Sequence, residues 1–252
     1  MTELLRGGHT ALDPRLGRLP EFDDRSWNWP IRGLLATEVG TAKPPLRSFT
    51  WPAPWEAMNQ LRTGHCVGFG HGGRAKGSPI LHPEVDNDWC HRYYKRCQDL
   101  DEWAGSETEE PTYEGSSVIA GSKTGIEWGI YESYWWGFGV EDAARVVGYV
   151  APGVAGTVWL DGMFDPRPSG LLEVSGSVAG GHCYLVRGIR LRAVLPGEGP
   201  TPLEVFRIRN SWGPKWGIAG DAFIKVEDFE RLQKMDGEIC FPVEPRQHRT
   251  EV

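Results

Sequence analysis

The stretch that decides the fold is Asn-Ser-Trp-Gly-Pro-Lys-Trp-Gly-Ile-Ala-Gly at residues 210–220. Apolar and polar side chains alternate over residues 203–210 just before it, the pattern of a half-buried strand, and an apolar run follows at residues 222–226. Taken alone, the stretch is a glycine-rich turn at the end of a strand. Further strands are predicted at residues 154–160 and 182–191. The second half of the chain is therefore expected to form a sheet, followed by a last helix over 227–234.

Helical patterns dominate the first half of the chain. Pro83 and the acidic residues after it are typical of the first turn of a helix, which is predicted to run to about Leu100. Two more short helices are expected over residues 116–126 and 140–147. Helices first and strands second predict an α+β chain, in which a helical lobe and a sheet lobe share a site in the groove between them.

The chain is expected to divide into an N-terminal arm and one domain. Residues 1–54 are rich in Pro, Arg and Asp and show little periodicity, so we expect either an extended arm that wraps the core or a weakly ordered tail. The domain is predicted over residues 55–252. Its helical lobe is placed at about 55–150, and its lobe of antiparallel β-sheet or barrel at about 151–252.

Composition excludes several classes of function. Of the 252 residues, 40% are hydrophobic and 24% charged, as in ordinary globular chains, and the net charge of -7 argues against nucleic acid as a partner. The longest uncharged run, residues 146–160, is short and interrupted by Pro and Gly, so no membrane span is expected, and the N-terminus resembles no signal peptide. Five cysteines without regular spacing predict reduced thiols and a cytoplasmic location.

Cys66 is the candidate nucleophile. A single cysteine in an apolar segment more often fills a core, but here glycines crowd it, at positions 64, 68, 70, 72 and 73. Small neighbours let a substrate backbone approach a thiol on a sharp turn into a helix. A helix that begins at Cys66 is also expected to lower the pKa of the thiol, because its unpaired N–H groups favour an anion.

Three other side chains complete a thiol acyl-transfer chemistry. His182 would pair with the thiolate and protonate the leaving amine, and Asn210 would orient its imidazole. Trp212 would cover that hydrogen bond. Gln60 would donate its amide, together with the Cys66 N–H, to the developing oxyanion. His65 adjoins Cys66 but is expected to point elsewhere, because consecutive side chains diverge.

Together these residues resemble the papain-like cysteine proteases. That family has a Gln six residues before its Cys, as Gln60 precedes Cys66, and a Gly two residues before it, as Gly64 does. Its Asn opens the signature that stands complete at 210–220. The resemblance covers roughly residues 52–240 and is strongest to short bacterial and phage-encoded members. It implies a two-lobed papain-like fold and a cysteine peptidase acting on protein or peptide substrates, without a cofactor or metal.

The chain departs from the family at several positions. Val67 stands where Trp commonly follows the Cys, Thr63 where a disulfide cysteine is often found, and Gly181 where Asp or Asn often precedes the His. A Pro/Gly-rich insertion lies at 195–202. No catalytic group is lost, but substrate preference and pH profile are put in question. The arm before residue 50 is too short to be the family's large prosegment, and the sequence leaves open whether it covers the cleft.

Other readings of these motifs remain. Cys90, His91, Cys97 and His82 could suggest zinc, but Cys90 and Cys97 are two helical turns apart, which favours packing. Gly-Ser-Lys-Thr at 121–124, which follows Gly115, lacks the spacing of a phosphate-binding loop, because Ser122 separates the glycine from the lysine. The alternative functions are a non-catalytic scaffold, for example a component of a phage particle, and an amidase that cuts cell-wall peptides. A phage-encoded protein would be virion-associated rather than free in the bacterial cytoplasm.

Overall fold

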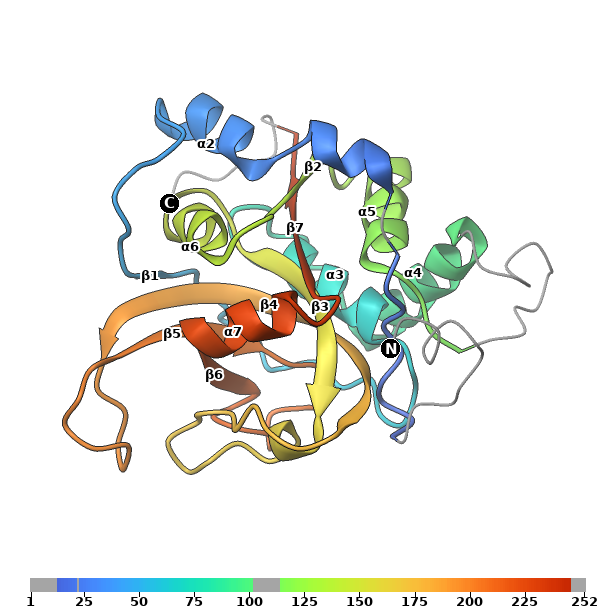
Figure 1. Cartoon of the computed structure of the whole chain (residues 1–252). Helices are drawn as coiled ribbons and strands as arrows, with labels where there is room; N and C mark the ends of the chain where they lie inside the picture. The colour runs from blue at the N-terminus through green and yellow to red at the C-terminus, as the bar shows by residue number, and fades with distance from the viewer. Residues whose placement is uncertain (1–12, 22, 102–113, 246–252) are drawn as a thin grey trace.

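A seven-stranded antiparallel sheet organises the chain (Figure 1). The structure is a computed structural model, and it describes residues 13–21, 23–101 and 114–245. The strand order is β2-β7-β3-β4-β5-β6, and β1 pairs with β4. The strands are β1 (Phe49–Thr50), β2 (Ser133–Trp136), β3 (Gly153–Leu160), β4 (Val178–Ala193), β5 (Leu203–Arg209), β6 (Asp221–Lys225) and β7 (Glu238–Val243).

Helices flank this sheet, and local capping decides where two of them begin. Asp86 accepts a hydrogen bond from the Trp89 N–H at 2.7 Å, and Ser117 accepts one from the Ala120 N–H at 3.1 Å. Both predicted helices therefore begin a few residues later than expected. The α-helices are α2 (Ile31–Val39), α3 (Cys66–Lys76), α4 (Asn87–Leu100), α5 (Val118–Glu127), α6 (Val140–Tyr149) and α7 (Val226–Gln233), with 3₁₀ turns η1 (Asp24–Asn28) and η2 (Asp161–Met163).

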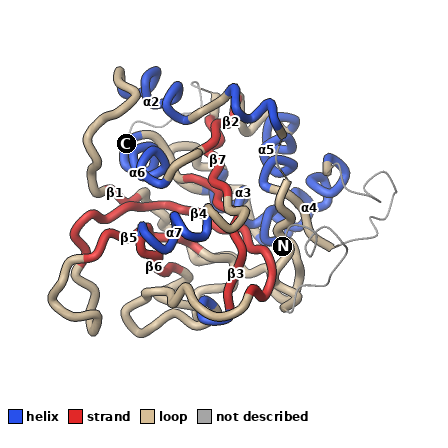
Figure 2. The backbone as a smooth tube through the Cα atoms, in the orientation of Figure 1, coloured by secondary structure: helices blue, strands red, loops and turns tan. Residues whose placement is uncertain are grey.

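The sheet buries a different core on each face, as Figure 2 shows in the separation of α3, α4 and α5 from α2 and α6. Val154 and Cys183 pack toward α3, α4 and α5, whereas their neighbours Ala155 and Tyr184 pack in the core shared with α2, α6 and α7. Because successive side chains of a strand point to opposite faces, β3 and β4 contribute to both cores. These two strands therefore connect the helical part to the sheet part.

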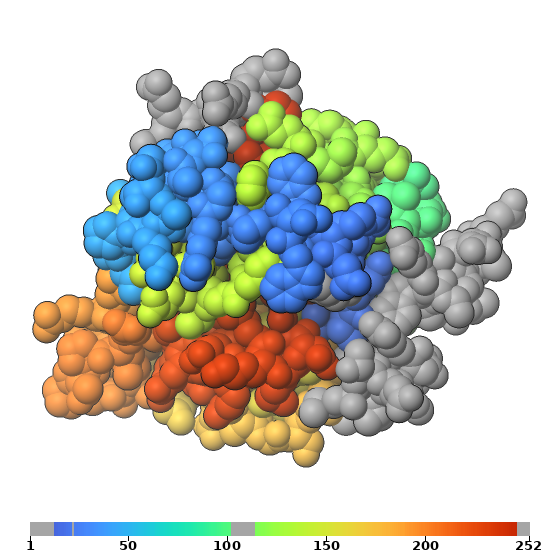
Figure 3. Space-filling model, turned by 45° about the horizontal axis from the view of Figure 1, so that its top comes forward, coloured from blue at the N-terminus to red at the C-terminus, as the bar shows by residue number. Residues whose placement is uncertain are grey.

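The predicted α+β class with a papain-like arrangement is confirmed, and each strand and helix predicted from periodicity has a counterpart. The short strands β1 and β2 were not predicted. Both lie before residue 150, in the predicted helical lobe, yet β1 pairs with β4 and β2 pairs with β7. The division of the domain into two lobes near residue 150 therefore stays a prediction. Residues 31–39, expected to be extended or weakly ordered, form α2, whose buried Ile31, Leu34 and Leu35 belong to the core that contains α6. In Figure 3 the blue N-terminal residues lie across the yellow-green residues that include α6.

All five cysteines are buried and free. Among the helices in the described ranges, none combines the length and the apolar character needed to cross a membrane.

Candidate active site

Cys66 is the first residue of α3 and is fully buried. Its thiol meets main-chain groups of Gly17, Val67 and Cys183. The close approach of α3 to β4 depends on glycine, because a Cβ on Gly70 would lie 2.7 Å from the Cys183 sulfur. Gly70 therefore serves helix-to-strand packing, which brings the thiol beside the residue that follows His182, whereas Gly68 and Gly72 face Cys90 of α4.

His182, near the start of β4, is bonded to Asn210, which follows the end of β5. Its Nε2 lies 2.8 Å from the Asn210 Oδ1, and that oxygen also accepts the Ser211 N–H at 2.7 Å. Because the Asn210 oxygen is an acceptor, Nε2 of a neutral His182 carries the proton and Nδ1 keeps its lone pair. Nδ1 is buried and has no hydrogen-bond partner within the described ranges. The His182 Nδ1 can therefore accept a proton, and no described residue donates a hydrogen bond to it.

Tryptophan rings enclose this hydrogen-bonded pair. The Trp159 ring lies edge-on to His182 with centroids 4.8 Å apart, and Trp212 is tilted against His182 at 4.9 Å. Trp216 packs edge-on against Trp212 at 5.7 Å, and the guanidinium of Arg15 lies 4.1 Å from the centre of the Trp212 ring. The rings keep water from the imidazole and bury it completely.

The glycines of the 210–220 stretch have conformations that other residues rarely adopt. Gly213, Gly217 and Gly220 have φ angles of 79°, 56° and 87°, all in the left-handed region. The turn closes where the Asn210 N–H donates to the Gly220 carbonyl at 2.9 Å. The glycine spacing of this stretch therefore sets the loop that holds Asn210 at the end of β5.

Gln60 is fixed by the same loop. Its main-chain N–H donates to the Ser211 carbonyl at 2.8 Å, and its Oε1 accepts the Ser211 hydroxyl at 2.6 Å. The amide nitrogen is thereby left to donate, and it does so to the Thr63 carbonyl at 2.6 Å and the Arg15 carbonyl at 2.9 Å. A main-chain carbonyl of the N-terminal segment thus occupies the donor that the sequence assigned to an oxyanion.

Residues 15–18, here called the N-terminal strap, cross the site and cover the thiol. The Gly17 carbonyl accepts the Ser116 N–H at 2.8 Å, and the Arg18 N–H donates to the Gly181 carbonyl at 3.0 Å. Contact is so close that a Cβ on Gly17 would lie 1.9 Å from the Gly64 carbonyl oxygen, and one on Gly181 would lie 2.1 Å from the Arg18 oxygen. Gly17 and Gly181 therefore allow the strap to lie this close to the site.

Ionisation in this closed form differs from what the sequence predicts. Burial raises the pKa of the Cys66 thiol to about 11, against main-chain hydrogen bonds from Gly17, Cys183 and Val67 that lower it. Burial also lowers the pKa of His182 to about 4, although the Asn210 hydrogen bond opposes this. The expected lowering of the thiol pKa by the helix terminus is wrong for the closed form, because desolvation outweighs it. Thiol and imidazole are both neutral at pH 7.

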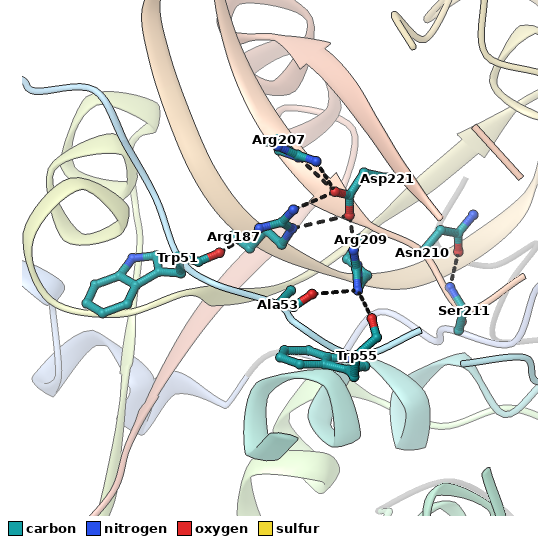
Figure 4. Close-up of polar contacts among 9 residues, drawn as sticks. All are labelled: Trp51, Ala53, Trp55, Arg187, Arg207, Arg209, Asn210, Ser211 and Asp221. Carbon is teal, nitrogen blue, oxygen red and sulfur yellow. Dashed lines mark hydrogen bonds and ion pairs between the residues drawn. The ribbon is translucent and has the colours of Figure 1, made fainter. Parts of the chain in front are cut away.

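A buried carboxylate, that of Asp221, joins β4, β5 and β6 near Asn210 (Figure 4). Asp221 accepts hydrogen bonds from Arg187 at 2.5 and 3.2 Å, from Arg207 at 2.7 Å and from Arg209 at 2.8 Å. Burial raises the pKa of Asp221, but hydrogen bonds from Arg187 and Arg209 outweigh it and keep that pKa below its usual value. β4, β5 and β6 are thereby clamped just before Asn210.

The same arginines anchor the segment that leads to Gln60. Arg187 Nη1 donates to the Trp51 carbonyl at 2.5 Å, and Arg209 Nη1 donates to the Trp55 carbonyl at 2.8 Å (Figure 4). Since this segment enters the helical part of the chain, the cluster ties the Gln60 side of the site to the Asn210 side.

The remaining sequence candidates lie elsewhere. The His65 Nδ1 lies 2.7 Å from the His91 Nδ1, and the His65 ring stacks on Tyr94, so this imidazole turns toward α4. Cys90 and Cys97 are buried in the core of α4. The described ranges hold no group of three or more His, Cys, Asp or Glu residues arranged for a metal ion.

Comparisons with known proteins bear on the fold. No protein-family model matches the sequence. No curated protein matches it either. Among solved structures, xylellain, a cysteine protease from Xylella fastidiosa, is similar with a TM-score of 0.61 and 15% identity over 93% of this chain and 97% of that chain. Digestive procathepsin L2 proteinase from Tenebrio molitor larval midgut has a TM-score of 0.58 and 15% identity, over 92% of this chain and 79% of that chain. Bromelain from Ananas comosus, in complex with the E64 inhibitor, has a TM-score of 0.51 and 12% identity, over 76% of this chain and 94% of that chain. At such identities the likeness shows the fold, which is that of papain-like cysteine proteases.

Sequence reasoning missed several residues around the site. Ser211 orients Gln60 and stands inside the 210–220 stretch, so its position was a usable signal. The sequence pattern places Trp159 in a strand and Asp221 at the start of another strand, and indicates no role in the site for either residue. Arg18 lies in a segment without periodicity, so the sequence could not predict its contact with Glu238, which is 220 residues away.

Proposed function

We propose that the chain is a cysteine peptidase in which Cys66 is the nucleophile, His182 the base and acid, Asn210 the orienting residue and Gln60 an oxyanion donor. His182 Nδ1 takes the thiol proton, and the thiolate attacks the carbonyl carbon of a peptide bond. Gln60 Nε2 and the Cys66 N–H stabilise the oxyanion. The imidazolium then protonates the amine as the C–N bond breaks, and water, deprotonated by His182, hydrolyses the thioester.

The observation that carries this proposal is the 2.8 Å contact between His182 Nε2 and an Asn210 oxygen that also accepts the Ser211 N–H. It sets the tautomer that leaves Nδ1 able to accept a proton. The Arg15 carbonyl on Gln60 Nε2 lends further support, because it shows that a peptide carbonyl fits that donor.

The substrate is proposed to be a protein or peptide, and the site of action the bacterial cytoplasm, or a virion if the chain is phage-encoded. The proposed substrate is supported by the likeness in fold to xylellain, a cysteine protease whose chain is covered to 97%. Sedimentation of a lysate of the host tests the two locations. A protein that stays in the supernatant is free in the cytoplasm, and one that sediments with phage particles is associated with the virion.

Labelling with a peptidyl epoxide tests the chemistry. Because the strap buries Cys66, the test uses a full-length variant with a weakened strap, Gly17→Ala, followed by peptide mapping. We expect modification of Cys66 over Cys90, Cys97, Cys183 and Cys240, and its loss when His182→Ala is added. Equal or absent labelling would favour the non-catalytic scaffold.

Gln60 has a separate test. In the Gly17→Ala protein, whose strap is already weakened, replacing Gln60 by Ala should lower kcat on the order of 10²–10³-fold if its amide holds the oxyanion. Thr63→Ala is the control, because the Thr63 hydroxyl donates to the Gln60 main-chain carbonyl, at 2.7 Å, and not to the Gln60 side chain. An unchanged kcat in Gln60→Ala would refute this role.

A further inference from the structure

The side-chain amide of Gln60 is held by hydrogen bonds at both of its ends. Its Oε1 accepts the Ser211 hydroxyl at 2.6 Å, and its Nε2 donates to the Thr63 carbonyl at 2.6 Å. Nε2 carries two hydrogens, and it also donates to the Arg15 carbonyl of the strap at 2.9 Å. The direction in which Nε2 offers a hydrogen to an oxyanion therefore depends on where the Thr63 carbonyl lies.

A carboxylate fixes the peptide group to which that carbonyl belongs. The peptide group that joins Thr63 to Gly64 is planar, so its C=O and its N–H move together. The Gly64 N–H donates to the Glu114 Oε1 at 2.9 Å. A Cβ on Gly64 would lie 3.0 Å from the Glu114 Cγ and 3.4 Å from its Cδ, so the Glu114 side chain packs where a side chain at 64 would stand. A single peptide plane thus links Glu114 to the Gln60 amide.

The helix α4 anchors both partners of this contact. Gly115, the residue after Glu114, donates its N–H to the Tyr94 hydroxyl at 2.7 Å. Tyr94 belongs to α4 and is 1% exposed. The same ring stacks on His65, the residue after Gly64, with ring centroids 3.8 Å apart. One buried side chain therefore fixes the chain on the Glu114 side and on the Gly64 side of the hydrogen bond.

We propose that Glu114 is a positioning residue for the oxyanion donor: its carboxylate holds the Thr63–Gly64 peptide group, which in turn orients the Gln60 amide. The inference rests on the proposed peptidase function of this site. Glu114 acts through hydrogen bonds alone, and no proton is transferred to it. A donor that is already oriented stabilises the oxyanion without reorganising during the reaction, so loss of the Glu114 contact slows the chemical step.

Steady-state kinetics of full-length variants tests this role. The background is the Gly17→Ala protein, and the substrate is a fluorogenic peptide selected from a library for cleavage by that protein. Adding Glu114→Ala should lower kcat by roughly two- to tenfold, the range for one hydrogen bond, and leave KM unchanged, because the oriented donor acts on the transition state. Glu114→Gln keeps an oxygen that can accept the Gly64 N–H and should keep most of kcat. Glu204→Ala, at an exposed site on β5, is the matched control.

A double-mutant cycle distinguishes the orientation of Gln60 from a general loss of structure. Gln60→Ala removes the donor that Glu114 orients, so adding Glu114→Ala to it should lower kcat no further. If Glu114 only stabilised the surrounding chain, the two losses of kcat would multiply.

Hydrogen exchange of the Gly64 amide gives a readout that does not need turnover. Nuclear magnetic resonance follows the exchange of this N–H in the Gly17→Ala protein. Adding Glu114→Ala should speed the exchange by roughly two- to tenfold, because the N–H loses its acceptor, whereas Glu114→Gln should keep most of the protection.

The outcomes separate this inference from the peptidase proposal. An unchanged kcat in Glu114→Ala, a Glu114→Gln protein as slow as Glu114→Ala, or losses that multiply in the cycle would overturn the inference and leave the peptidase standing. An unchanged exchange rate of the Gly64 amide in Glu114→Ala overturns it as well. A Gly17→Ala protein that cleaves no peptide and whose Cys66 is not labelled overturns the peptidase, and the positioning role with it.

Discussion

Replacing Gly17 by alanine should release the N-terminal strap from the thiol. The new Cβ would lie 1.9 Å from the Gly64 carbonyl oxygen and 2.6 Å from the Gly64 carbonyl carbon and Cα, all of them backbone atoms. Overpacking of this kind costs about 1–3 kcal/mol. Because each 1.4 kcal/mol is tenfold, the ratio of open to closed molecules should rise by roughly 5- to 150-fold.

The rate of thiol labelling at Cys66 reports that ratio. In the closed form the thiol is fully buried, and burial raises its pKa to about 11, so reaction proceeds through open molecules. The labelling rate should therefore rise by the same factor as the ratio, until the open form dominates. Mass spectrometry of the Cys66 peptide over time measures it.

Gly139→Ala is the matched control, because a Cβ at Gly139 meets nothing within 4 Å among the described residues. Its labelling rate should equal that of the wild type. An unchanged rate in a folded Gly17→Ala protein would refute the reasoning, since the thiol would then be reached without moving the strap.

Two further predictions concern stability. Asp221→Asn should destabilise the fold by about 3–5 kcal/mol in urea unfolding, because it leaves buried arginines without their carboxylate. Glu227→Gln, at an exposed site, is the control and should have little effect. Equal urea midpoints for the two variants would contradict the role of Asp221 in joining the strands. Since burial lowers the pKa of His182 to about 4 from 6.5, the unfolded chain takes up a proton that the folded chain does not between those values, so stability should fall as the pH drops from 6.5 to 4, by about 3 kcal/mol from this group. Urea unfolding of His182→Gln should show that much less loss over the same range, and an identical pH dependence would contradict the burial argument.

The elements that could be predicted are those with a local cause. Strands β3 to β6 and helices α4 to α7 follow from the spacing of apolar residues, which is a property of neighbours in sequence. The short strands β1 and β2 have too few residues to show a period. The helix α2 lies in a segment whose Pro and charge content hides the few apolar residues, Ile31, Leu34 and Leu35, that it buries.

The sequence by itself determined the chemical groups of the candidate site and the loop that presents Asn210. That loop is local, because glycines at 213, 217 and 220 are required by their positive φ angles. Only the tertiary structure decided the state of the site. The closed thiol, the direction of its pKa and the pairing of Arg18 with Glu238 across 220 residues all arise from burial and from contacts between distant segments, which periodicity and spacing do not encode.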